Sequence, residues 1–218
     1  LRTATSIFGV PMERITVIPN GVNIDQFPLG EESERKSQII FVGSLIERKG
    51  VNYLIEAMAI VKKKHPECEL LLVGEGRDRD EYEKLVHNLG LEETVFFLGV
   101  QSQQNVSQLM RQSRLFVLPS IEEGQGVVLV EAMASGTPCV GSRVGGIPDV
   151  ITPEVGKLVE PRNIKSLAEA INIFLDNDEL WRHASLKARE RVENIYDWFT
   201  LADKMIGIYD KVLNKDEI

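Results

Sequence analysis

The sequence contains two cysteines and three histidines among its 218 residues. Cys68 and Cys139 lie in or beside apolar runs and have neither metal-ligand nor redox spacing, so we interpret them as small core residues. His65, His87 and His183 share no ligand spacing with one another or with the cysteines. This pattern disfavours both a disulfide framework and a zinc site, and the cytoplasm is the expected location.

Basic residues and long apolar runs are also scarce. The chain has 25 Lys and Arg residues against 33 Asp and Glu residues, for a net charge of −8 and a pI near 5.1. Nucleic acid is therefore not expected as a partner, because binding its phosphates needs clustered basic residues. No apolar run approaches the roughly twenty residues that span a bilayer, so we expect no transmembrane segment.

Length and composition favour one domain. With 43% hydrophobic residues, 218 residues can bury a full core, and we expect a single domain over 1–218 rather than two small ones. Leu1 is not an initiator methionine, and residues 1–10 (LRTATSIFGV) are typical of the tail of a helix. We therefore expect an excised domain.

Short apolar runs rich in β-branched residues alternate with helical patterns along the first two thirds of the chain. Nearly continuous apolar strands indicate a parallel sheet covered on both faces, so we predict a Rossmann-like, doubly wound α/β fold with ligands bound outside the carboxyl ends of the strands. From residue 163 onward the pattern predicts three helices and no further strand. The predicted strands are 15–18, 38–43, 69–74, 95–99, 114–119 and 138–142.

A glycine-rich step joins the strand that ends near residue 119 to the next helix. Gly124 and Gly126 allow a sharp turn, and the helix is predicted to begin near Val127 with its N–H groups directed at an anion. Side chains lean toward a helix N-terminus, so Glu131 reaches back toward the edge that Glu123 occupies.

Both acids can therefore line one cleft. A carboxylate repels phosphate but accepts hydrogen bonds from hydroxyl groups, so Glu123 and Glu131 suit the sugar hydroxyls that flank a diphosphate in a nucleotide sugar. The alternative is that Glu123 is a solvent-exposed loop residue and Glu131 a surface residue of the helix.

The loop after residue 43 also leads from a predicted strand through a glycine to a helix. Its sequence, FVGSLIERKGVNYLIEA, places Arg48 and Lys49 at a helix start, where positive charge opposes the helix dipole. An anionic ligand would relieve that conflict, and a solvated basic turn is the alternative. The acids in RDRD (77–80) imitate a metal-binding motif, but they open a helix, where the dipole favours acids, so we expect no metal site there.

Several stretches together resemble the C-terminal domain of glycosyltransferase family 4. They are VIPNGVN followed by F and P (17–28), FVGSLIERKGVNYLIEA (41–57), LLLVGEG (70–76), FLGV (97–100) and EGQGVVLVEAMASGTPCVGSRVGGIPDVI (123–151). The resemblance covers nearly the whole chain and includes the paired glutamates with seven residues between them. It implies one half of a GT-B fold, and a retaining, metal-independent transferase of hexosyl type.

The resemblance also implies roles for individual residues. Lys49 would neutralise the donor diphosphate, Glu131 would bind the ribose hydroxyls, and Glu123 would contact the transferred sugar, so Glu123 and Lys49 are the candidate catalytic residues. No cofactor is implied, and the donor would be a UDP-, GDP- or ADP-sugar. Further donor contacts are expected from Gly43, Ser44, Arg48, Val100, Gly124, Gln125, Gly126, Val127 and Val128.

The sequence departs from the family pattern at three positions. Ser44 stands where the family often has arginine, and Arg48 is the candidate substitute for that charge. Gln125 replaces a commonly aromatic residue between the two motif glycines. Asp149 stands where glutamate is frequent, and no role is assigned to it.

The implied acceptor domain is an N-terminal domain of the same polypeptide, absent from this chain. A peripheral membrane contact through that domain is left open. We expect the chain alone to bind a nucleotide sugar and to transfer little or no sugar. The alternatives are a GT-B nucleotide-sugar epimerase, which the glutamate spacing disfavours, and a non-catalytic nucleotide-binding module.

Overall fold

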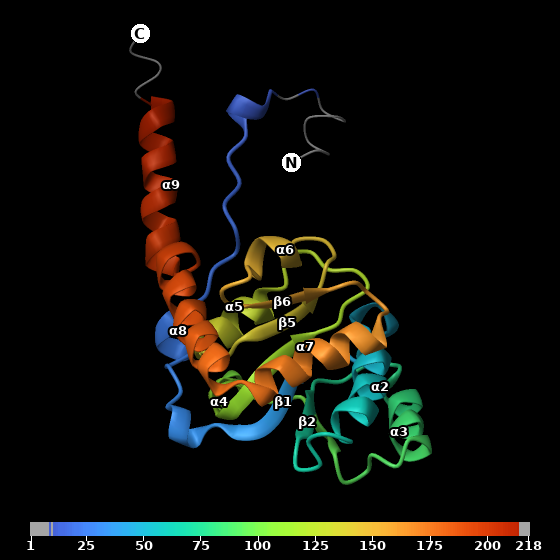
Figure 1. Ribbon diagram of the computed structural model, residues 1–218. Coiled ribbons are helices and arrows are strands. Elements are labelled where there is room, and N and C mark those ends of the chain that lie inside the picture. The colour runs from blue at the N-terminus through green and yellow to red at the C-terminus, as the bar shows by residue number, and fades with distance from the viewer. Residues whose placement is uncertain (1–8, 10, 214–218) are drawn as a thin grey trace.

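A parallel sheet forms the centre of the molecule in the computed structural model, which describes residue 9 and residues 11–213 (Figure 1). The strand order is β3-β2-β1-β4-β5-β6, and every neighbouring pair is parallel. Helices cover both faces, so the central strands are apolar and buried over most of their length, after polar residues at their starts. The strands are β1 (Lys36–Val42), β2 (Glu69–Val73), β3 (Val95–Gly99), β4 (Ser113–Leu118), β5 (Cys139–Ser142) and β6 (Gly156–Val159).

Two features of the sheet differ from the sequence prediction. The strand predicted over 15–18 is wrong: this segment has no regular structure, and Val17 is 54% exposed. An apolar run becomes a strand only where a neighbouring strand supplies hydrogen bonds, and residues 15–18 run outside the sheet (Figure 1). Strand β6 was not predicted, because its sequence GKLV is short and carries an exposed lysine at the sheet edge.

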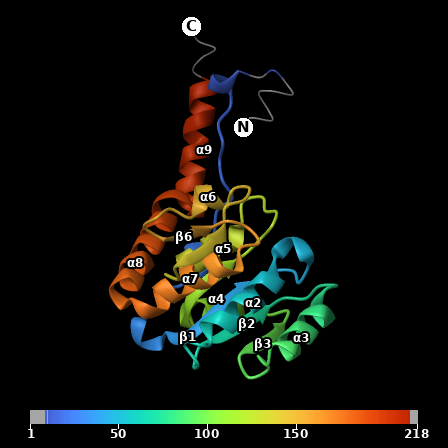
Figure 2. The same ribbon diagram turned by 45° about the vertical axis from the view of Figure 1, so that its right-hand side comes forward.

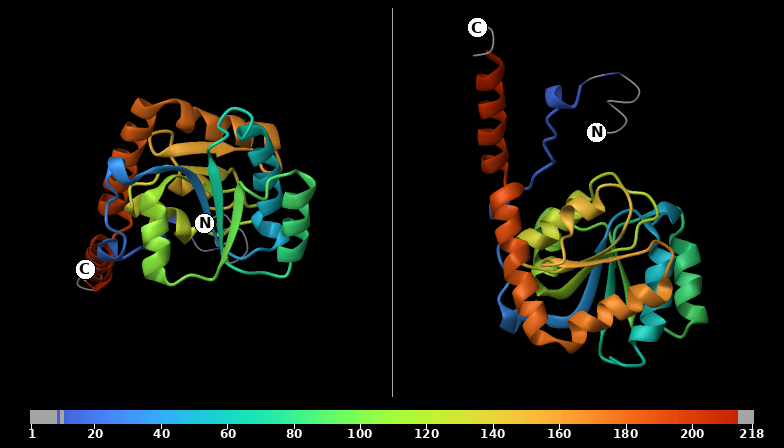
Figure 3. Two further views of the ribbon diagram at one scale, coloured as in Figure 1. Left: turned by 90° about the horizontal axis from the view of Figure 1, so that it is seen from below. Right: turned by 45° about the horizontal axis from the view of Figure 1, so that its top comes forward.

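The helices form two layers. After β1 and β2 the chain passes through α2 and α3, which pack together, and α7 packs beside α2. Helices α4 and α5 follow β3 and β4 and lie on the other side of the sheet, where α8 covers α5 (Figure 3). The bounds are α2 (Val51–Val61), α3 (Arg79–Asn88), α4 (Gln103–Gln112), α5 (Val127–Ala134), α6 (Ile147–Val150), α7 (Ile164–Asp176), α8 (Asp178–Ile195) and α9 (Trp198–Leu213).

Helix α9 projects from the body of the domain beside the segment that follows residue 11 (Figures 1 and 2). The prediction of three C-terminal helices is confirmed by α7, α8 and α9. The helix tail predicted for residues 1–10 lies, apart from Gly9, outside the described residues. No described helix is both long and apolar enough to cross a membrane.

The strand order creates a crevice between β1 and β4. From β1 the chain proceeds to β2 through α2, and from β4 it proceeds to β5 through α5 on the opposite face. The helices that follow these two adjacent strands therefore lie on opposite faces of the sheet, and ligands of open α/β sheets bind in the crevice at such a switch point, next to the loops that leave the strands. The first loop spans residues 43–50 and the second spans 119–126.

Candidate functional site

Backbone contacts hold the two loops together. The carbonyl oxygen of Arg48 accepts hydrogen bonds from the N–H groups of Ile121, at 2.8 Å, and Glu122, at 3.3 Å. Gly50 has a φ of +67°, and a Cβ built there would lie 2.2 Å from the carbonyl oxygen of Pro119. Glycine at this position permits both the left-handed conformation and the close approach, so the sequence itself fixes how the loops meet.

The structure brings Lys49 and Glu123 into direct contact. The Lys49 Nζ lies 2.5 Å from Glu123 Oε2, and the two side chains are only 13% and 10% exposed. The same carboxylate accepts a hydrogen bond from the Ser120 hydroxyl at 3.3 Å and one from the Gly124 N–H at 3.0 Å. The two candidate catalytic residues therefore form one ion pair across the crevice.

Arg48 takes a different direction from its neighbour. Glu47–Lys49 forms a short 3-10 helix, η4, that precedes α2. The Arg48 side chain is exposed and lines a hollow of about 200 Å³ together with Arg77 and Arg162. Ser44 lines a separate hollow, so the structure separates Arg48 from the position whose charge it was expected to replace.

The start of α5 provides N–H groups that have no protein acceptor. Gly126 precedes the helix with a φ of +74°. The N–H groups of Gly126, Val127 and Val128 donate no hydrogen bond to any described residue. Unpaired N–H groups at a helix N-terminus are well placed to bind an anion, as the sequence predicted for this step.

Glu131 lies one turn into α5 and is half-buried. Burial raises the pKa of its carboxyl group above the ordinary value. Within residues 11–213, its carboxylate takes part in no hydrogen bond or ion pair. A partly desolvated carboxylate without a partner is the arrangement expected for a group that binds hydroxyl donors of a ligand.

Two arginines fix the far end of α5. Arg35 donates to the carbonyl oxygens of Ser135 at 2.7 Å and Gly136 at 3.2 Å, and Arg189 donates to that of Ala134 at 2.8 Å. These bonds satisfy carbonyl groups that a helix C-terminus leaves unpaired. Neither arginine was predictable from the sequence, because nothing in their local pattern distinguishes them from solvent-exposed arginines.

A hollow of about 280 Å³ lies over the carboxyl ends of β1, β2 and β3. It is lined by Gly43, Ser44 and Val100, three of the predicted donor-contact residues, and by Gly74 and Gln101. Val100 is 76% exposed. A Cβ on Gly74 would lie 2.0 Å from the Gly43 carbonyl oxygen, so a larger residue would distort the floor of this hollow.

Gln125 contacts the N-terminal segment. Its Oε1 accepts a hydrogen bond from the Asn20 N–H at 2.7 Å, and its Nε2 donates to the Asn20 carbonyl oxygen at 2.8 Å. This pair secures the VIPNGVN segment beside the second loop. Sequence analysis noted that segment as a motif but missed Asn20 as a contact of Gln125.

Asp78, one of the acids in RDRD (77–80), makes a structural contact. Asp78 Oδ2 accepts a hydrogen bond from the Glu47 N–H at 2.6 Å, which connects the start of α3 to the first loop. Within the part of the chain that the structure describes, no group of three or more His, Cys, Asp or Glu residues is arranged to hold a metal ion.

Fold and crevice together define a Rossmann-like α/β domain whose anion-compatible crevice lies at the switch point of the sheet. A family model described as "Glycosyl transferases group 1" matches residues 24–191. The chain belongs to this family of glycosyltransferases.

Two curated relatives illustrate the similarity. The chain is 34% identical to an uncharacterized glycosyltransferase of Methanocaldococcus jannaschii, over 94% of this chain and 56% of that protein. It is 36% identical to the N-acetyl-alpha-D-glucosaminyl L-malate synthase of Bacillus anthracis, over 83% of this chain and 46% of that protein. The chain therefore spans about half the length of the curated relatives it matches.

Solved structures agree with this assignment. The HepE protein of Anabaena in complex with UDP has a TM-score of 0.86 at 26% identity, covering 96% of this chain and 61% of that one. Sucrose-phosphate synthase from Thermosynechococcus elongatus has a TM-score of 0.82 at 30% identity, covering 92% of this chain and 53% of that one. The predicted fold class is confirmed, since these structural neighbours are GT-B glycosyltransferases.

Proposed function

We propose that this chain is the donor-binding domain of a retaining glycosyltransferase that transfers a hexosyl group from a nucleoside diphosphate sugar. The observation that carries the proposal is the grouping of Lys49, Glu123 and the unpaired N–H groups of α5 at the switch-point crevice. Lys49 and these N–H groups supply the positive field that a diphosphate needs, and Glu123 supplies a hydroxyl acceptor next to it.

On this proposal, Lys49 exchanges its carboxylate partner for the diphosphate when the donor binds. Lys49 is paired with Glu123 in the structure. A diphosphate carries more negative charge than one carboxylate, so it draws Lys49 away from Glu123 or shares it. Glu123 then accepts hydrogen bonds from the transferred sugar, and its contacts with Ser120 and Gly124 keep it in position.

The nucleoside would occupy the hollow of about 280 Å³ beside Gly43, Ser44 and Val100. Glu131 would accept hydrogen bonds from the ribose hydroxyl groups, which relieves the cost of holding its carboxylate partly buried and unpaired. UDP is the first nucleotide to test, because HepE has been solved with UDP and with UDP-glucose.

Catalysis on this proposal rests on charge stabilisation without a metal ion. Negative charge grows on the departing diphosphate as its bond to the sugar breaks, and Lys49 with the α5 N–H groups stabilises that charge. As the resemblance to glycosyltransferase family 4 implies, the product would keep the anomeric configuration of the donor.

The acceptor would come from a second domain of the same polypeptide, outside this chain. Helix α9 supports this part of the proposal, since large apolar side chains along it are exposed: Trp198 57%, Phe199 74%, Ile206 56% and Tyr209 60%. A helix that projects from its own domain with an apolar surface buries it against another one. Closure between the two domains would align the acceptor and exclude water.

Calorimetric titration with UDP, UDP-glucose and GDP-mannose in the presence of EDTA tests the donor site. We expect saturable binding of at least one nucleotide, with the same affinity after Mg²⁺ is added. Binding that disappears with EDTA would contradict the metal-free mechanism. No binding of any nucleotide would contradict the donor site itself.

A second experiment tests the two-domain arrangement. Sugar transfer by this chain alone is compared with transfer by the same chain fused to an N-terminal domain taken from a full-length relative. We expect turnover from the fusion and little from the chain alone, because orientation and desolvation in a closed crevice contribute about 7 to 11 kcal/mol to lowering a barrier. Full activity of the chain alone would refute this arrangement, and an inverted product would refute the retaining mechanism.

A further inference from the structure

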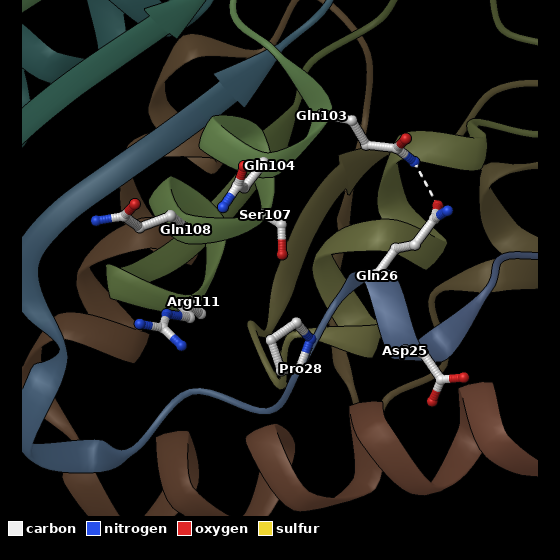
Figure 4. A pocket seen from close by; sticks show the side chains of 8 residues that line it. All are labelled: Asp25, Gln26, Pro28, Gln103, Gln104, Ser107, Gln108 and Arg111. Carbon is white, nitrogen blue, oxygen red and sulfur yellow. Dashed lines mark hydrogen bonds between the residues drawn. The ribbon is translucent and has the colours of Figure 1, made fainter.

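A third hollow, of about 460 Å³, lies between α4 and residues 25–28 (Figure 4). None of the predicted donor-contact residues lines it. Its volume is in the range of pockets that hold small-molecule ligands. The hollow is thus a separate candidate site, and its lining shows which chemistry it would accept.

Amide side chains dominate the lining. The Gln103 Nε2 donates to Gln26 Oε1 at 2.8 Å, which joins α4 to the short helix before Pro28 (Figure 4). Gln104 and Gln108 also line the hollow, and their amides form no hydrogen bond with any residue the structure describes. An amide group both donates and accepts hydrogen bonds, and carries no charge.

Two further polar groups lack a partner within the described chain. Ser107 is only 4% exposed, yet its hydroxyl points into the hollow and takes part in no hydrogen bond there. The Nε of Arg111 is buried without a hydrogen-bond partner, and the nearest acid contact of this guanidinium is Glu34 at 3.9 Å. The Ser107 hydroxyl is therefore available to a ligand or ordered water in the hollow. The buried Arg111 Nε has too little accessible surface to contact one.

The charge balance narrows the ligand class. Asp25 and Arg111 contribute one charge of each sign, so the hollow offers no excess positive charge for a phosphate. Uncharged groups that both donate and accept hydrogen bonds match hydroxyl groups, which do the same. Pro28 adds an apolar surface against which the carbon face of a sugar ring can lie.

We propose that this hollow binds a neutral oligosaccharide, as an accessory carbohydrate site distinct from the donor crevice. Gln104, Gln108 and Ser107 would bind its hydroxyl groups directly, and the exposed end of the Arg111 guanidinium would donate to a further hydroxyl oxygen. The proposal does not rest on the donor site, since no residue is shared between the two.

The test is a titration of the ¹⁵N-labelled chain with maltotriose, α-linked mannotriose and chitotriose at millimolar concentrations, followed by NMR. We expect saturable shifts in the side-chain amide signals of Gln104 and Gln108 and in the backbone of α4 with at least one of the three sugars. UDP, titrated separately, should shift signals of the two crevice loops instead, so failure of one site is distinguishable from failure of the other.

Matched variants locate the site. Gln104→Ala with Gln108→Ala should weaken oligosaccharide binding at least about tenfold, because several hydrogen bonds are lost. Both residues are exposed on a helix, where alanine is well tolerated, and circular dichroism checks that the variant is folded. Gln112→Ala, on the same helix but outside the hollow, is the control and should bind as the unaltered chain does.

A second variant, Ser107→Ala, removes only the buried hydroxyl and should weaken binding about threefold to tenfold. No saturable shift in α4 with any of the three sugars would overturn the proposal. Equal loss of binding in Gln112→Ala, or equal shifts on adding inorganic phosphate, would overturn it as well.

Discussion

The loop before α5 and the first turns of α5 each present a glutamate to the same region, and their surroundings differ. Glu123, in the loop, contacts Lys49, the Ser120 hydroxyl and the Gly124 N–H. Glu131, in the helix, has no partner within the described residues, and burial raises its pKa. Contacts within the protein stabilise the Glu123 carboxylate, whereas no such contact offsets the cost of partly burying the Glu131 carboxylate.

This difference indicates what each region contributes to ligand binding. A carboxylate that is already paired can exchange its partner when a competing anion arrives, so the loop can respond to the diphosphate. An unpaired, half-buried carboxylate gains most from a neutral hydroxyl donor, so the helix region suits the ribose. The following predictions test whether the two regions differ in this way.

The largest effect is expected from Lys49→Ala. The variant removes the cation of the crevice, so UDP affinity should fall about tenfold to a hundredfold in calorimetric titration, the range for a hydrogen bond to a charged group. The free energy of unfolding should fall by about 1 to 3 kcal/mol, because the Glu123 carboxylate loses its counter-ion but keeps its contacts with Ser120 and Gly124.

Lys187→Ala is the matched control for that variant. Lys187 forms an ion pair with Glu190 at 2.7 Å, with side chains 37% and 55% exposed. Surface pairs of this kind contribute little, so neither UDP affinity nor stability should change measurably. Unchanged UDP affinity in Lys49→Ala would mean that the loop pair is structural only.

Glu131→Gln should weaken UDP binding by about 1 to 2 kcal/mol, because a charge-assisted hydrogen bond to the ribose becomes a neutral one. 2′,3′-Dideoxy-UDP, which lacks the ribose hydroxyl groups, should bind the variant and the unaltered chain equally. A variant that loses affinity equally for UDP and for this analogue would place the ribose elsewhere.

The same variant should have the opposite effect on stability without ligand. Because the pKa of Glu131 is raised in the folded state, its contribution favours folding below the ordinary value of 4.5 and is lost as the pH rises through the raised pKa. Glu131→Gln should therefore have a higher free energy of unfolding than the unaltered chain at pH 7. Denaturant titrations at several pH values should show this difference shrinking as the medium is acidified, and a constant difference would contradict it.

The fold could be predicted from the sequence where apolar runs and helical periodicity agree with tertiary contacts. Strands β1 to β5 and the three C-terminal helices follow from local patterns. The strand predicted over 15–18 does not form, because no strand of the sheet lies beside this segment to pair with it. Whether a segment has such a neighbour depends on residues far away in the sequence. Strand β6 is stabilised by pairing with β5 rather than by its own composition.

The candidate site was predictable to a similar extent. Glycines and charges next to predicted strand ends single out Lys49 and Glu123, which the structure brings into contact, whereas the crevice role of Glu131 stays a prediction. The sequence could not show that Lys49 pairs with Glu123, or that Gln125 pairs with Asn20, because these contacts join residues separated by 74 and 105 positions. Such pairs depend on the order of strands in the sheet, which local patterns do not encode.

A smaller effect is expected from Glu123→Gln, and it has the opposite sign to that of Lys49→Ala. Without the carboxylate, Lys49 is not neutralised by its partner, so UDP alone should bind about threefold more tightly, the effect of removing one competing hydrogen-bond partner. UDP-glucose should lose its advantage over UDP, because the acceptor for the sugar hydroxyls is gone. Weaker binding of UDP alone would show that Glu123 is not competing with the diphosphate for Lys49.

The smallest effect on affinity is expected from Gln125→Ala. Gln125 makes both hydrogen bonds of its amide to the backbone of Asn20, and none to the ion pair. Loss of these bonds should lower the free energy of unfolding by about 1 to 2 kcal/mol and accelerate amide hydrogen exchange at Asn20, while UDP affinity stays within about twofold. Gln101→Ala is the control, since the Gln101 amide donates only to the nearby Leu98 carbonyl oxygen and should leave exchange at Asn20 unchanged. A large loss of UDP affinity in Gln125→Ala would mean that the N-terminal segment, through Gln125, shapes the crevice itself. Residues 20–22 would then have to be counted with the loop before α5 as part of the donor site.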